Sequence, residues 1–125
     1  MKNLWNYSEA KKFIKKYKSL NCSSDLALRV YTSRLLGANK ELVLHGGGNT
    51  SVKTKQKDID GIEYDVICVK GSGWDLDSIE PEGLPAVKLQ PLLKLKNKKK
   101  LTDNDMVSYQ KRQLLDLKSP NPSVE

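Results

Sequence analysis

Histidine and cysteine are scarce in this chain, which has one histidine and two cysteines among 125 residues. Cys22 and Cys68 are far apart, and no CxxC motif is present. Zinc ribbons and disulfide frameworks both need several such residues at close spacing. The sequence therefore excludes both, and we expect the two cysteines to be reduced thiols.

Long apolar runs are also missing. No stretch approaches the roughly 18 apolar residues that a membrane-spanning helix needs. Polar and charged residues are frequent in 1–19, where a signal peptide would have an apolar core. We therefore expect a cytoplasmic protein with no membrane partner. Aromatic residues make up only 6% of the chain, but its 38% hydrophobic and 30% charged residues are typical of a globular protein, and the length suits one domain, 1–125.

Basic residues outnumber acidic ones, which gives a formal net charge of +7 and a pI near 9.4. This charge favours anionic ligands without identifying them. Lysines crowd 94–100, but no aromatic residues are interleaved with them and no nucleic-acid-binding motif accompanies them. Nucleic acid and anionic membrane stay as alternatives to the partner that we expect, a phosphorylated metabolite.

Two helices are predicted within 8–36. The first is capped by Ser8 and ends near Leu20, with apolar residues on one face and lysines on the rest. The second begins at Ser23 or the next serine and ends before Gly37. Its buried stripe is predicted to consist of Leu28, Tyr31 and Leu35.

Strands and turns are predicted to alternate over 41–76. A short apolar run at 42–44 and an alternating stretch at 51–54 are both predicted strands. A polar hairpin loop at 55–64 then leads to the strongest strand, 65–70.

The C-terminal third is predicted to be irregular before it ends in a helix. Three prolines in 78–91 exclude a long regular helix there. The segment 103–117 has apolar residues at helical spacing, with Thr102 as its cap, and Ser-Pro-Asn-Pro at 119–122 ends it. The helix and the C-terminal turn together span 103–125.

Two glycine-rich turns follow predicted strands. One reads His-Gly-Gly-Gly-Asn-Thr-Ser from His45 to Ser51, and the other reads Lys-Gly-Ser-Gly-Trp from Lys70 to Trp74. Glycines let backbone N–H groups approach a ligand closely, and short polar side chains add donors, which suits a phosphate. Neither turn has the spacing of a Walker loop or a dinucleotide-binding loop. Each could equally be an ordinary tight turn, so an anion site requires that the two converge, with Lys70 adding charge.

Three ordered motifs resemble the class II aldolase/adducin family. They are Leu-His-Gly-Gly-Gly-Asn-Thr-Ser at 44–51, Val-Lys-Gly-Ser-Gly-Trp-Asp-Leu at 69–76 and Asn-Pro-Ser-Val-Glu at 121–125. The chain is most similar to the N-terminal part of such a domain, in particular the aldolase part of bifunctional rhamnulose-1-phosphate aldolase/alcohol dehydrogenases. This resemblance implies a three-layer α/β/α fold with a mainly antiparallel central sheet, lacking its C-terminal part.

The resemblance also implies a phosphate site. In family aldolases the first turn binds the substrate phosphate, which here assigns Gly48 and Asn49 to it. The second turn assigns Ser72 and Gly73, and the third assigns Ser123. The family often has a second serine where this chain has a valine, so one donor is missing from that turn.

Glu125 would be the catalytic acid/base of the family. The resemblance further implies a zinc ion, which polarises the carbonyl of dihydroxyacetone phosphate. The family's histidine ligands follow the glutamate, and this chain has only His45, which lies in the first turn. We therefore expect a fragment of a lyase, with no metal ligands of its own and negligible activity when isolated.

The alternative is a non-catalytic, adducin-like binding or scaffolding module, since that branch keeps the fold without the enzyme site. A histidine pair encoded soon after Glu125 would favour the aldolase. Family aldolases are homo-oligomers, and we expect the same of the full-length form.

Overall fold

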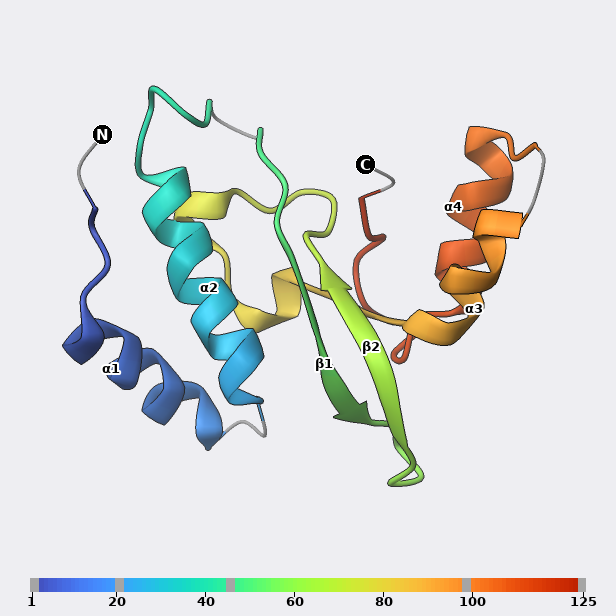
Figure 1. Cartoon of the computed structure of the whole chain (residues 1–125), viewed down its shortest axis with the longest axis horizontal. Helices are drawn as coiled ribbons and strands as arrows, with labels where there is room; N and C mark the ends of the chain where they lie inside the picture. The colour runs from blue at the N-terminus through green and yellow to red at the C-terminus, as the bar shows by residue number, and fades with distance from the viewer. Residues whose placement is uncertain (1–2, 20–21, 45–46, 98–99, 124–125) are drawn as a thin grey trace.

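The computed structural model describes residues 3–19, 22–44, 47–97 and 100–123. Within them, two helices precede a three-stranded sheet, and two shorter helices follow it (Figure 1). In this view α1 and α2 lie to one side of β1 and β2, and α3 and α4 lie to the other. The elements are α1 (Tyr7–Lys18), α2 (Ser24–Gly37), β1 (Ser51–Lys57), β2 (Glu63–Val69), β3 (Ala86–Lys88), α3 (Leu89–Leu93), α4 (Asp103–Arg112) and three 3-10 helices, η1 (Leu76–Ser78), η2 (Pro81–Gly83) and η3 (Lys94–Asn97). The fold is mixed α/β with an antiparallel sheet, as expected.

The sheet has the order β1-β2-β3 with antiparallel neighbours throughout. β1 and β2 form the predicted hairpin, in which Ser51 faces Val69 and Lys57 faces Glu63. Both strands extend further than the pattern indicated, so the loop is shorter than 55–64. Even polar residues extend a ladder when their backbones pair, since the side chains on one face remain in water.

The first helix begins earlier than predicted. Its cap is Asn6, whose side chain accepts a hydrogen bond from the Glu9 backbone N–H at 3.1 Å, whereas Ser8 lies inside the helix. Asparagine and serine cap equally well, so the two positions could not be separated by residue type. The predicted end at Leu20 lies outside the described residues.

The second helix begins as predicted, with Ser23 accepting a hydrogen bond from the Leu26 backbone N–H, but it includes Gly37, before which it was predicted to end. Its predicted stripe was only partly right, because Leu28 and Leu35 are half-buried and only Tyr31 is buried. The helix packs against α1, β1 and η1 together, so its buried surface is broader than one stripe. The residues that it buries are Leu26, Ala27, Val30, Tyr31 and Ser33.

Two strand predictions need correction. The apolar run 42–44 is not a strand: the backbone N–H groups of Leu42 and Val43 both donate to the Asn39 carbonyl and close a turn. Conversely, 86–88 forms β3, whose three residues give too short a pattern to recognise among prolines.

The last helix is shorter than predicted. Thr102 caps it in a reciprocal capping box with Asp105, as the sequence indicated. It ends at Arg112 because the following residues turn to the sheet, where Leu114 forms an antiparallel bridge with Val87. Beyond Arg112, Leu114 therefore lies at the sheet edge, whereas Leu117 is exposed.

A polar cluster ties the two N-terminal helices to the segment after the second glycine turn. The Arg34 guanidinium lies 2.7 Å from a Glu80 carboxylate oxygen and donates to the Ile79 carbonyl. The Tyr17 hydroxyl donates to the other oxygen of Glu80 at 2.7 Å. Burial, and then this hydrogen bond, raise the pKa of Tyr17 to about 12. Burial alone would raise the pKa of Glu80, but the bond from Tyr17 and the charge of Arg34 outweigh it and lower that pKa.

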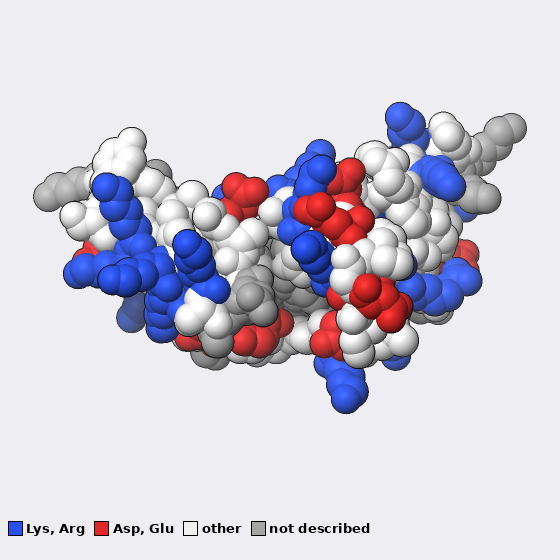
Figure 2. Space-filling model, turned by 90° about the horizontal axis from the view of Figure 1, so that it is seen from below, with Lys and Arg blue, Asp and Glu red and all other residues white. Residues whose placement is uncertain are grey.

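Basic side chains gather over the end of the molecule that α1 forms (Figure 2). The exposed lysines of this helix are Lys11, Lys12, Lys15, Lys16 and Lys18. Among the described residues, Glu9 forms an ion pair with one of them, Lys12. Much of the positive charge therefore lies on a solvated helix face.

Candidate functional site

Three segments that are far apart in the sequence meet at the end of β2. The backbone N–H of Lys70 donates to the Thr50 carbonyl at 3.0 Å, and the Lys70 carbonyl accepts from the Ser123 N–H at 2.9 Å. One residue thereby joins the end of the first glycine turn to the C-terminal turn. The convergence that an anion site would require is present in the backbone.

The side chains of these turns also contact one another. The Asn49 amide nitrogen donates to the Ser123 hydroxyl oxygen at 3.1 Å. The backbone N–H and the hydroxyl of Ser72 both contact the Asn121 carbonyl oxygen, at 2.9 and 3.3 Å. Gly71 and Pro122 form an antiparallel bridge beside them. Asn49 and Ser72 are exposed and Ser123 is half-buried, so solvent can reach the polar groups that the sequence singled out.

Both glycines assigned to the site have left-handed backbones, with φ of +83° at Gly48 and +86° at Gly73. Only glycine adopts this conformation without strain. A side chain at Gly48 would also lie 2.7 Å from a methyl carbon of Leu76, whereas one at Gly73 would meet no atom within 4 Å. The second turn therefore borders open space in which a ligand could lie.

Lys70 is nine-tenths buried, with 8% of its surface exposed. None of the ion pairs formed between described residues involves it. Its positive charge, at the point where the turns meet, would favour an anion bound close by.

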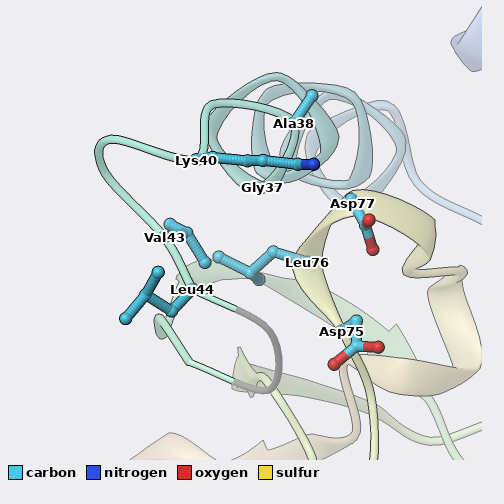
Figure 3. Close-up of a pocket in the computed structure, with 8 residues that line it drawn as sticks. All are labelled: Gly37, Ala38, Lys40, Val43, Leu44, Asp75, Leu76 and Asp77. Carbon is cyan, nitrogen blue, oxygen red and sulfur yellow. The ribbon is translucent and has the colours of Figure 1, made fainter.

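A separate hollow of about 350 Å³ lies next to the two glycine turns (Figure 3). It is formed between the end of α2, residues 43–44 and residues 75–77. None of Asn49, Ser72 and Ser123 lines it. Lys40 and Asp77 give it charges of both signs, so it is a poorer anion site than the place where the turns meet.

Glu125, the assigned acid/base, lies outside the described residues, as does His45. Among those that are described, no group of three histidine, cysteine, aspartate or glutamate side chains could hold a metal ion. In the same part of the chain, no helix is long and apolar enough to cross a membrane.

Sequence reasoning gave no role to Ser33. It counted Thr50 only among the short donors of the first turn, and it placed Asn121 only within a motif. Ser33 is fully buried and contacts Thr50, next to Asn49. A serine within a helix gives no signal that it will contact the residue 17 positions later, just before β1, so only the folded chain reveals the contact.

The chain was compared with known proteins. No family model matches it. Among solved structures, it is similar to the N-terminal class II aldolase domain of a conserved protein from Thermoplasma acidophilum, with a TM-score of 0.83 and 37% identity, over 100% of this chain and 53% of the other. This chain has the fold of an N-terminal class II aldolase domain.

Among curated proteins, the chain is 34% identical over 125 residues to the "uncharacterized oxidoreductase YuxG" of Bacillus subtilis (strain 168). The match covers 100% of this chain and 17% of that relative. The chain thus spans about half of the matched aldolase structure and about a sixth of the curated relative. The class II aldolase resemblance in the sequence is confirmed for the fold.

Proposed function

We propose that this class II aldolase domain binds the phosphate of a ketose 1-phosphate, such as rhamnulose 1-phosphate. The whole protein would cleave that substrate to dihydroxyacetone phosphate and an aldehyde. The meeting of Asn49, Ser72 and Ser123 carries the proposal. The fold likeness to a class II aldolase domain supports it. A three-layer α/β/α arrangement and a closer kinship with bifunctional rhamnulose-1-phosphate aldolase/alcohol dehydrogenases belong to the same proposal.

The donors at the three turns suit a phosphate. The hydroxyls of Ser72 and Ser123 and the amide of Asn49 would turn towards its oxygens in place of their present partners. Backbone N–H groups at Gly48 and Gly73 would add donors, since left-handed turns can direct successive N–H groups to one anion. Hydrogen bonds to a charged group contribute about 1.5–3 kcal/mol each.

Phosphate binding alone would not cleave the substrate, because an interaction that is equal in ground and transition states leaves the barrier unchanged. We assign the proton transfer at the carbon next to the carbonyl to Glu125. A bound zinc ion would supply Lewis acidity in the family enzyme. The described residues do not fit such an ion, since they offer it no cluster of ligands. The isolated chain should therefore bind phosphate compounds without cleaving rhamnulose 1-phosphate.

Titration of the 125-residue chain with dihydroxyacetone phosphate and with inorganic phosphate, followed by NMR, tests this function. We expect the largest amide shifts around Asn49, Ser72 and Ser123. The variants Asn49→Ala and Ser123→Ala should each weaken binding about tenfold or more, as expected for the loss of one hydrogen bond to a charged group.

Ser108→Ala is the matched control, because this serine is exposed on α4, away from the turns. It should bind phosphate as the wild type does. Shifts confined to the lysines of α1, or equal affinity in all variants, would overturn the assignment of the site.

A further inference from the structure

A polar contact between α2 and the start of β1 lies directly behind the first turn. The Ser33 hydroxyl oxygen lies 2.6 Å from the Arg29 carbonyl oxygen and 2.8 Å from the Thr50 hydroxyl oxygen. Ser33 has no exposed surface, and Thr50 is half-buried. Hydroxyl groups in such surroundings require hydrogen-bond partners, and these two hydroxyls supply one for each other.

The direction of these hydrogen bonds follows from proton counting. A serine hydroxyl has one proton and two lone pairs. A carbonyl can only accept, so the Ser33 proton is donated to Arg29. The Thr50 hydroxyl must then donate to Ser33. Thr50 is thereby held in one rotamer by a rigid helix.

Thr50 in turn controls the geometry of the candidate site. It follows Asn49 in the chain, and its carbonyl accepts the hydrogen bond from the Lys70 N–H. Asn49 makes the side-chain contact with Ser123. The helix, the first turn, β2 and the C-terminal turn are therefore linked through a single threonine.

We propose that Ser33 and Thr50 are positioning residues, which hold Asn49 and the end of β2 in the arrangement that binds phosphate. This inference rests on the function proposed above. Neither side chain needs to touch the ligand. Their hydroxyls act through the backbone of the first turn.

The chain offers a matched control on the same two elements. Thr54 lies further along β1, where its hydroxyl contacts Ser23 at 3.3 Å and Asp25 at 3.1 Å, both at the other end of α2. Thr50→Val and Thr54→Val each remove one hydroxyl between α2 and β1 at nearly constant volume. Only the first lies next to Asn49.

We expect Thr50→Val to weaken binding of inorganic phosphate about 3- to 10-fold, the usual effect of one neutral hydrogen bond. Thr54→Val should leave the affinity unchanged, and Thr50→Ser, which keeps the hydroxyl, should restore it. Ser33→Ala should weaken binding to a similar extent but have little further effect in the Thr50→Val background. This non-additivity would indicate that the two residues act as a pair.

A second measurement needs no ligand. In Thr50→Val, the Asn49 side-chain amide signals should shift and hydrogen exchange at the Lys70 N–H should accelerate, whereas in Thr54→Val both should stay as in the wild type. Unchanged signals and exchange in Thr50→Val would overturn the positioning role, whether or not phosphate binds. Absence of phosphate binding by the wild type would refute the proposed function alone, since the amide measurements would still decide the positioning role.

Discussion

Replacing Gly37 with alanine should destabilise this protein, although the same change in most helices stabilises them. Gly37 is the last residue of α2. A β-carbon there would lie 2.3 Å from the Asp77 backbone nitrogen and 2.5 Å from the Leu76 carbonyl carbon. Real β-carbons do not come closer than 3.0 Å to such atoms, so α2 or η1 must move.

The cost follows from what has to move. Both close atoms belong to the backbone, which cannot rotate away as a flexible side chain can. Overpacking of this kind costs about 1–3 kcal/mol, and the better helix propensity of alanine offsets at most about 1 kcal/mol of it in a helix interior. We expect a net loss near 1–2 kcal/mol in the free energy of unfolding, which lowers Tm by several degrees in a domain of this size.

Urea denaturation followed by circular dichroism measures this loss as a lower midpoint with an unchanged m-value. Ser108→Ala serves as the control, because it places alanine on the exposed surface of α4 and should be neutral or slightly stabilising. If Gly37→Ala proves as stable as the wild type, the close approach of α2 to η1 is wrong.

Two further predictions concern titratable groups. Because the pKa of Glu80 is lowered in the folded state, its ionised form stabilises the fold above the usual glutamate pKa, and this contribution is lost as the pH falls through the folded-state value. Glu80→Gln should therefore lower the free energy of unfolding by about 1 kcal/mol at pH 7, as expected for a partly exposed ion pair with Arg34, and by almost nothing in acid. If urea denaturation shows the same loss at every pH, this prediction is wrong. Burial, and then the nearby Cys22 thiol, raise the pKa of Cys68 to about 12. Iodoacetamide at pH 8 should therefore modify Cys22 well before the fully buried Cys68. Equal labelling of the two cysteine-containing peptides, measured by mass spectrometry, would contradict the buried position of Cys68.

Local patterns were sufficient where a segment's structure depends on its own residues. The start of α2 at a serine cap, the Thr102 cap of α4 and the β1–β2 hairpin are all confirmed. Each depends on hydrogen bonds between residues close in sequence, or on alternation along one strand. The errors occurred at 42–44, where hydrogen bonds to the Asn39 carbonyl close a turn, and at 86–88, which becomes a strand only by pairing with β2.

For the candidate site, too, some properties follow from the local sequence and others only from the tertiary structure. Residue types and motif spacing by themselves determined which turns could bind an anion, because glycines and short donors have this capacity wherever they lie. Only the tertiary structure decided that the turns of Asn49, Ser72 and Ser123 meet, that Lys70 is buried beside them and that Ser33 supports Thr50. These relations join residues separated by up to 74 positions. They depend on how the sheet and the helices pack, which no local pattern contains.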